Sequence, residues 1–308
     1  MIFLSLVVVL LLVQWWGSGA PLQYDAWFIR LADSLKNLAV IGNSPLLHLT
    51  LSLLIPSLIL ALLVYLITVL LSVNWLFFLY VPVLLYSLGR GNFSTEVKAY
   101  IAASERGDNV MASRLTDELR GGAGSEESCP DVENWPMLHS ETLRVISYRG
   151  FERMFAVLFW FFILGAVGAL LYRLSVIYRE RETVTTSHGR LAARWLWLME
   201  WPAVRVMGLT WALVGNFETC YRCWQARLLD VKHSSMTLLN NSLRGALGVD
   251  DPLLGNCDTN DSEPNVSEPT VTPNEPVYSL SLIKSSVPLF SRALLLWVCV
   301  LALITLVL

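Results

Sequence analysis

Charged side chains are scarce in this chain: Asp, Glu, Lys and Arg make up 15% of its 308 residues, whereas 55% of the residues are hydrophobic. Such a composition is typical of an integral membrane protein. The formal net charge is −3, so the chain lacks the excess of basic residues with which proteins bind nucleic acid. We therefore expect the lipid bilayer, and no nucleic acid, to be its main partner.

Familiar catalytic and cofactor motifs are also missing. The sequence contains no Gly-rich loop ending in Gly-Lys-Ser/Thr, no HExxH and no GxSxG, which excludes the local signatures of Walker-type ATPases, zinc proteases and serine hydrolases. The four histidines are scattered, and His48, at the start of an apolar segment, is expected to lie at the membrane interface. Cys220 and Cys223 have zinc-like spacing, but no second pair completes a four-ligand site. These absences favour a protein that is not an enzyme, and we predict no metal and no cofactor.

Five apolar segments stand out in the sequence. They are Ile2–Trp16, Leu46–Leu71, Val73–Leu88, Phe155–Leu171 and Leu289–Leu308. Crossing a bilayer takes about 20 predominantly apolar residues, so the second and the last are expected to span it. The others are short enough to be tilted, partial or packed against neighbours. The predicted fold class is an all-α, polytopic integral membrane protein with a cytoplasmic helical insertion.

The first of these segments has two interpretations. Ile2–Trp16 has the length of a secretory signal core, and small residues follow it at positions 17–20. No Lys or Arg precedes it, however, and the adjacent Trp15 and Trp16 fit an interfacial anchor better than an approach to a cleavage site. A retained helix is the favoured interpretation.

The distribution of Lys and Arg predicts an orientation in the membrane. The segment Gly89–Gly150 contains Lys98 and six arginines, and Lys284 and Arg292 lie at the start of the last helix, next to the segment Cys220–Ser286. Because cytoplasmic loops of membrane proteins carry an excess of Lys and Arg, we expect both segments to face the cytoplasm and the amino terminus to lie outside.

This orientation requires an even number of crossings between Gly150 and Cys220. Either Phe155–Leu171 and Ala192–Val214 both cross the membrane, or neither does. Several arginines lie between the two segments, and the second contains charged residues and Pro202, which suit an interfacial or broken helix. We favour a re-entrant or half-embedded pair, and a hairpin that crosses twice is the alternative.

The polar parts of the chain are simpler. Ala26–Ile41 has the pattern of an amphipathic helix lying along the interface. Glu96–Glu118 is expected to form two short helices broken at Gly107-Asp108. Gly121–Asp131 and Asp250–Pro276 are acidic and poor in apolar residues, and the second is expected to be a flexible loop. The predicted division is therefore N-terminal membrane helices 1–88, a cytoplasmic helical loop 89–150, embedded helices 151–216, a cytoplasmic segment 217–287 and a C-terminal membrane helix 288–308.

A polar stripe precedes the fourth apolar segment. If Leu138–Arg153 is helical, four side chains recur at three- and four-residue steps on one face, and two arginines lie beside it. These residues are Glu141, Arg144, Tyr148 and Glu152, flanked by Arg149 and Arg153. Such a face suits an anionic ligand. The alternative is a solvated helix with internal ion pairs, whose arginines meet lipid headgroups.

Four sequence features occur together in a familiar order. They are the run Ala99–Asp108, Glu141, the stretch Gly168–Arg173 that ends the fourth apolar segment, and Trp201–Arg205. In order and spacing these features, which fall within roughly Leu46–Asn216, resemble the CobD/CbiB superfamily, and within it the AmpE branch.

That resemblance implies a multi-pass protein of the bacterial inner membrane, associated with β-lactamase regulation and linked to peptidoglycan recycling. It also places Glu141, Tyr172, Arg173 and Arg205 in a functional site. With two residues of the polar stripe, the predicted ligand-binding set is Glu141, Tyr148, Arg149, Tyr172, Arg173 and Arg205.

Three functions are compatible with this set. The favoured one is a non-enzymatic sensor or signalling modulator of β-lactamase induction, which recognises a cell-wall-derived or nucleotide-like ligand. The second is an ATP-dependent amide-forming ligase, like the adenosylcobinamide-phosphate synthase of the sister branch, and the third is a scaffold for other membrane proteins. The ligases place Asn and Asp after the Tyr-Arg pair, whereas this chain has Leu174–Ile177 there, which favours the modulator.

We predict that reporter fusions at Gly122 and at Pro264 both give cytoplasmic signals, because of the Lys and Arg distribution described above. Fusions to green fluorescent protein and to alkaline phosphatase measure this directly. Strong alkaline phosphatase activity at either position would contradict the predicted orientation.

Overall fold

The computed structural model describes residues 2–16, 24–38, 44–70, 73–89, 93–121, 134–182, 185–226, 228, 234–249 and 275–307. Every regular element in these ranges is a helix, which confirms the predicted all-α class. The elements are α1 (Ile2–Trp16), α2 (Ala26–Lys36), α4 (Pro45–Leu70), η2 (Val73–Trp75), α5 (Leu76–Ser87), α6 (Phe93–Glu105), α7 (Asn109–Arg120), α8 (Trp135–Gly150), η3 (Phe151–Phe155), α9 (Ala156–Arg181), α10 (Ser187–Val214), α11 (Phe217–Ala226), α12 (Ser235–Ala246) and α14 (Glu275–Val307).

Three described stretches are long and apolar enough to cross a bilayer: Pro45–Leu70, Trp135–Arg181 and Val277–Val307. The first and last contain the two segments that the sequence predicts to span. The fourth apolar segment is longer than predicted, because the helix that contains it continues past Leu171 to Arg181. Shorter apolar helices cover Phe3–Val13 and Leu76–Ser87. Length and apolarity therefore support a membrane protein.

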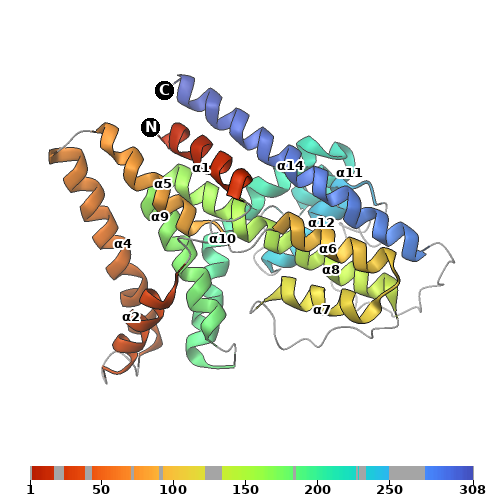
Figure 1. Ribbon diagram of the computed structural model, residues 1–308, viewed down its shortest axis with the longest axis horizontal. Coiled ribbons are helices and arrows are strands. Elements are labelled where there is room, and N and C mark those ends of the chain that lie inside the picture. Colours follow the sequence, from red (N-terminus) through yellow and green to blue (C-terminus); the bar gives the residue numbers. More distant parts are fainter. Residues whose placement is uncertain are drawn as a thin grey trace. The chain divides into compact units, whose positions relative to one another are not determined.

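The described chain forms two compact units. The first comprises Met1–Asn92, Glu152–Ala203 and Val300–Leu308, and the second comprises Phe93–Phe151 and Val204–Cys299. In the first unit, α9 packs against both α4 and α5, α1 packs against α5, and α2 packs against α4 (Figure 1). Each unit thus combines segments that are far apart in the sequence.

The core of the first unit lies around α9. Phe161 of α9 and Leu84 of α5 are fully buried, and the ring of Phe161 makes an edge-on contact with Tyr80 at 5.8 Å between centroids. On α4, by contrast, Leu58 and Ile59 are each 63% exposed. Apolar side chains on the outside of a long apolar helix suit contact with hydrocarbon, in which they need no protein partner.

Gly165 interrupts α9. Its backbone has φ +64° and ψ −152°, a conformation that is essentially restricted to glycine. Because this residue is not helical, the regular i to i−4 hydrogen-bond ladder cannot run through it. The tyrosine hydroxyl of Tyr80 lies 3.6 Å from the position that a Cβ atom on Gly165 would occupy. The sequence favours an interfacial or broken helix over Ala192–Val214, but α10 passes through Pro202 as one helix and the interruption lies in α9. Whether either helix crosses the membrane stays a prediction.

In the second unit, α7 packs against α6 and α8, and α12 packs against α8 and α11. The predicted pair of short helices is confirmed: α6 ends at Glu105 and α7 begins at Asn109. Gly107 has φ +71°, and the Asp108 carboxylate accepts a hydrogen bond of 3.0 Å from the amide of Met111. A left-handed glycine followed by an N-terminal cap is the expected way to stop one helix and start another.

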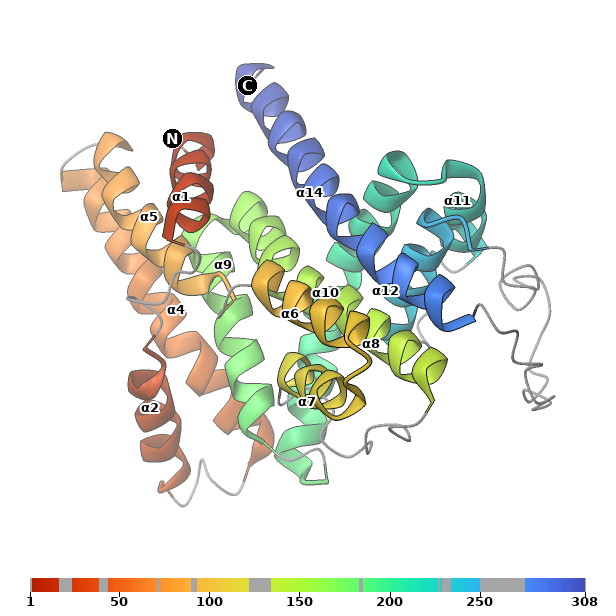
Figure 2. The same ribbon diagram turned by 45° about the vertical axis from the view of Figure 1, so that its right-hand side comes forward.

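The helix α14, drawn in blue in Figure 2, joins this unit through aromatic and polar contacts. Phe290 makes edge-on contacts with Phe93 and Trp211, at centroid distances of 5.6 and 5.7 Å. A Cβ atom on Gly150 would lie 2.5 Å from the Phe290 ring, so only glycine permits this approach. Lys284 also pairs with Glu105 at 2.7 Å.

Three predicted boundaries differ from the structure or fall outside it. The amphipathic helix expected over Ala26–Ile41 ends at Lys36, and residues 39–41 lie outside the described residues. The acidic segment Asp250–Pro276 is described only at its last two residues, which already belong to α14, so the expected loop ends before Glu275. Of Gly121–Asp131, only Gly121 is described.

We expect Gly165→Ala to lower the free energy of unfolding by about 1–3 kcal/mol, because alanine must adopt a backbone conformation reserved for glycine. Thermal or denaturant unfolding of the purified protein in detergent measures the loss. Gly107→Ala is the comparison, since a Cβ atom there meets nothing within 4 Å and costs only about 1 kcal/mol of left-handed strain. Equal stability of Gly165→Ala and the unmodified chain would contradict the break in α9.

Candidate functional site

Glu141 lies between two arginines in the second unit. Its Oε1 accepts hydrogen bonds from Arg120 of α7 at 2.9 Å and from Arg144 at 3.1 Å, and its Oε2 accepts one from Arg144 at 2.8 Å. The side chain of Arg120 is 7% exposed and that of Glu141 is 16% exposed. Arg120 also lies 3.9 Å from the carboxylate of Asp117, so two carboxylates accompany the two guanidinium groups. The predicted i, i+3 pairing on α8 is therefore present, and a second arginine from another helix completes it.

Arg149 caps the carboxyl end of α7. Its guanidinium donates to the carbonyl oxygens of Leu119 at 3.1 Å and of Arg120, and the residue is 4% exposed. The last carbonyls of a helix have no partner within the helix and carry partial negative charge, so a buried cation is well suited to them. A Cβ atom on Gly121, where α7 ends, would lie 2.5 Å from Nη2 of Arg149. Arg149 and Gly121 therefore fix how α7 packs on α8.

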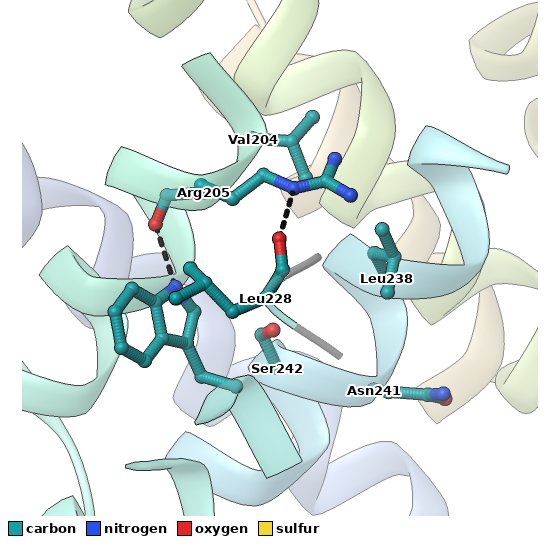
Figure 3. A pocket seen from close by; sticks show the side chains of 7 residues that line it. Val204, Arg205, Leu228, Leu238, Asn241 and Ser242 are labelled. Carbon is teal, nitrogen blue, oxygen red and sulfur yellow. Dashed lines mark hydrogen bonds between the residues drawn. The ribbon is translucent and has the colours of Figure 1, made fainter. Parts of the chain in front are cut away.

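Arg205, on α10, lines a small cavity in the same unit. Its Nε donates to the carbonyl oxygen of Leu228 at 3.2 Å, and its own carbonyl accepts a hydrogen bond of 2.8 Å from the indole of Trp224 (Figure 3). The cavity has a volume of about 20 Å³ and is also lined by Ser242 and Asn241, which gives room for about one water molecule. Arg205 thus ties α10 to the segment that follows α11.

Tyr172 and Arg173 lie in the first unit. The hydroxyl of Tyr172, which is fully buried, donates to Oε1 of Glu200 at 3.4 Å. Nη2 of Arg173 lies 3.8 Å from Oδ2 of Asp25, with each side chain 9% exposed. Nε of Arg173 is buried and has no hydrogen-bond partner. This guanidinium is therefore only loosely neutralised.

The structure divides the six predicted ligand-binding residues between the two units. Glu141, Tyr148 and Arg149 lie on α8, and Tyr148 is 6% exposed. Arg205 belongs to the same unit, whereas Tyr172 and Arg173 belong to the other. Within the second unit, the positive charges of Glu141's two partners and of Arg149 gather where α7 meets α8.

A buried polar cluster in the first unit was not predicted as a site. His48 is 1% exposed; its Nε2 donates to the carbonyl oxygen of Ala32 at 3.0 Å, so its Nδ1 accepts from the hydroxyl of Tyr178 at 2.6 Å. The ring of His188 lies 5.5 Å from that of His48, and burial lowers the pKa of His188. His48 is thus buried between helices of the unit rather than placed at its surface. The residues next to His48 in the sequence do not indicate that it contacts Tyr178, which lies 130 residues further along the chain.

The same region fastens α2 to the end of α9. Arg181 donates to the carbonyl oxygen of Ile29 at 3.2 Å and pairs with Asp33, and Lys36 pairs with Glu182 at 3.2 Å. Together with Asp25 and Ala32, these contacts hold the amphipathic helix along its whole length. The charged residues of α2 therefore serve tertiary contacts in addition to any contact with water or lipid.

The remaining candidate chemistry is sparse. No group of three or more His, Cys, Asp or Glu side chains within the described part of the chain is arranged to hold a metal ion. The thiol of Cys220 is buried and donates to the carbonyl oxygens of Ser242 at 3.3 Å and Gly208 at 3.7 Å. The geometry of Cys220 is thus that of a thiol used in helix packing.

Comparison with known proteins places these features in a family context. A family model described as "Regulatory signalling modulator protein AmpE" matches residues 1–250. The protein named AmpE of Shigella flexneri is 26% identical over 162 residues, which cover 50% of this chain and 56% of that protein.

Two proteins named cobalamin biosynthesis protein CobD are also similar. That of Stutzerimonas stutzeri is 36% identical over 106 residues, 32% of this chain and 34% of that protein. That of Chromobacterium violaceum is 30% identical over 112 residues, 35% of this chain and 36% of that protein. The matches thus span about a third of the two CobD proteins. No solved structure matches the chain.

We expect Arg149→Ala to lower the free energy of unfolding by about 1.5–3 kcal/mol, the usual effect of hydrogen bonds to a charged group. Unfolding of purified protein in detergent gives the value. Arg114→Ala is the matched control on α7, because the exposed pair of Arg114 with Glu118 contributes only about 0.3–0.5 kcal/mol. If both variants lose the same small amount of unfolding free energy, the buried cap stabilises the protein no more than a surface ion pair does.

Proposed function

We infer that this chain, which belongs to the AmpE family of regulatory signalling modulators, modulates the induction of a β-lactamase from the bacterial inner membrane. The match of the family model to residues 1–250 carries this proposal. The long apolar helices support a location in a membrane. Multiple crossings and a cytoplasmic face for α6 to α8 are part of the proposal.

The ligand that we propose is anionic and derived from peptidoglycan recycling, or resembles a nucleotide. Support comes from Arg173, whose Nη2 lies 3.8 Å from the Asp25 carboxylate and whose buried Nε has no hydrogen-bond partner. Buried guanidinium groups bind carboxylates and phosphates with two parallel hydrogen bonds, which gives both strength and specificity.

The six predicted residues divide into two roles in this proposal. Arg173 and Tyr172 contact the ligand in the first unit. Glu141, Arg149 and Arg205 are positioning residues, since they bind other segments of the second unit. Tyr148 is buried on α8. Modulation requires that ligand binding changes how helices pack, and residues that join helices are where such a change is transmitted.

A second candidate function is supported by a specific observation. The identity of 36% to the CobD protein of Stutzerimonas stutzeri favours an amide-forming ligase of the cobalamin pathway. Such a reaction activates a carboxylate with ATP, and phosphoryl transfer needs oxygen ligands that hold Mg²⁺ on the phosphates. Among the residues after Arg173, Leu174–Ile177, only Ser175 has a side-chain oxygen, and its hydroxyl already bonds to the carbonyl oxygen of Leu171 and to the indole of Trp195. We therefore place the ligase second.

The test compares β-lactamase induction in the host bacterium with and without the gene. We expect deletion to lower the β-lactamase activity that follows an inducing β-lactam, and a plasmid copy to restore it. Glu141→Gln, which keeps the shape but removes the charge between Arg120 and Arg144, should restore it poorly at equal membrane abundance. Glu141→Asp should restore it better, because it keeps a carboxylate.

Arg114→Ala is the control, since it breaks an exposed ion pair away from this cluster and should behave like the unmodified gene. Unchanged induction after deletion would contradict the modulator. If the deletion strain instead fails to grow when it depends on newly made cobalamin, the ligase replaces the modulator as the proposed function.

A further inference from the structure

Arg173 is a buried cation whose hydrogen bonds are incomplete. Its side chain is 9% exposed, its Nε is buried without a partner, and its Nη2 lies 3.8 Å from the Asp25 carboxylate. That distance allows an electrostatic attraction but exceeds a hydrogen bond, for which 2.7–3.2 Å is usual. A buried donor without an acceptor is costly, more so on a charged group.

The unsatisfied edge of Arg173 has a specific shape. Nε and Nη2 point the same way from one side of the planar guanidinium, and this pair of donors matches two oxygens of one carboxylate or phosphate group. Nε has no acceptor in the structure and Nη2 has only the distant carboxylate. A neutral molecule such as water would satisfy the donors but not the charge, so an oxyanion is the better partner.

Asp25 occupies the approach to this edge. It immediately precedes α2, and its side chain is 9% exposed. The Tyr86 hydroxyl of α5 lies within electrostatic reach of both Asp25 and Arg173. Asp25 and Tyr86 already interact through their side chains, so the Asp25 carboxylate has a second partner when another anion takes its place beside Arg173.

We propose that the Nε–Nη2 edge of Arg173 binds an oxyanion, a carboxylate or a phosphate group, in competition with the Asp25 carboxylate. Asp25 acts as an internal substitute that neutralises the site when it is empty, and its displacement loosens the amino-terminal end of α2. This inference deepens the proposed function, because it names the chemistry of the ligand and the helix that responds to it.

The experiment titrates inorganic phosphate into the purified full-length protein in a maltoside detergent, at constant ionic strength, and follows the midpoint of thermal unfolding. A ligand that binds the folded state raises this midpoint with its concentration. We expect Asp25→Asn to lower the half-saturating phosphate concentration about tenfold, since a competing charge-assisted contact is removed. Acetate should act in the same way but more weakly.

Two variants of Arg173 distinguish the loss of the phosphate site from a general loss of folding. Arg173→Gln removes the charge, whereas Arg173→Lys keeps it but lacks the two parallel donors; both should lose the phosphate response. Lys36→Gln is the matched control, because it breaks another ion pair between α2 and the end of α9 and should respond like the unmodified protein. A normal response in Arg173→Lys, or weaker binding in Asp25→Asn, would overturn the proposal.

The source of the oxyanion is separated by adding phosphatidylglycerol. If a lipid headgroup fills the site, this lipid raises the midpoint and free phosphate adds nothing further; if the ligand is soluble, the phosphate response persists in its presence. Phosphate binding is measured without any signalling assay. If phosphate does not bind but Glu141→Gln still restores induction poorly, as expected above, this inference is wrong and the proposed function stands.

Discussion

Burying a guanidinium among apolar helices is favourable only when its charge is neutralised and its N–H groups find acceptors. This requirement determines how the polar parts of the chain are arranged. Arg120 and Arg144 share the carboxylate of Glu141, and Arg149 donates to the carbonyl oxygens that end α7. The contacts of Arg120 with Glu141 and of Arg149 with the end of α7 join α7 to α8. The position of α7 on α8 is therefore set by charge as well as by shape.

The first unit meets the same requirement less completely. Arg181 and Lys36 have close carboxylate partners, and His48 has both ring nitrogens hydrogen-bonded. Arg173 is different, since its nearest carboxylate is 3.8 Å away and its Nε has no partner. The function that we propose requires a place where a ligand changes the packing of the helices. An incompletely neutralised buried charge provides one.

Features encoded by neighbouring residues were predictable from the sequence. The all-α class followed from apolar length, the break between α6 and α7 from Gly107 and Asp108, and the pairing of Glu141 with Arg144 from their spacing on one helix. Contacts between distant residues were not predictable. Nothing near His48 indicates Tyr178, and nothing near Arg149 indicates the end of α7, because such partners are chosen by tertiary packing.

The interruption of α9 and the composition of the two units belong to the same class of feature. Glycines are common in membrane helices, so Gly165 in an apolar run does not by itself indicate a break; its backbone angles do. The units combine separate stretches of the chain, whereas composition divides a sequence only into consecutive segments. The division into consecutive segments therefore stays a prediction about topology.

The most direct measurement is of the arginine Nε–H signals by nuclear magnetic resonance in detergent micelles, with each signal assigned from its loss in an Arg-to-Lys variant. We expect the Arg149 proton to exchange slowly with water and to ignore phosphate, because it is buried against two carbonyl oxygens. The Arg173 proton should shift when phosphate is added. Fast exchange at Arg149, as for the exposed Arg114, or an Arg173 signal that ignores phosphate, would contradict the division between a structural and a ligand-binding arginine.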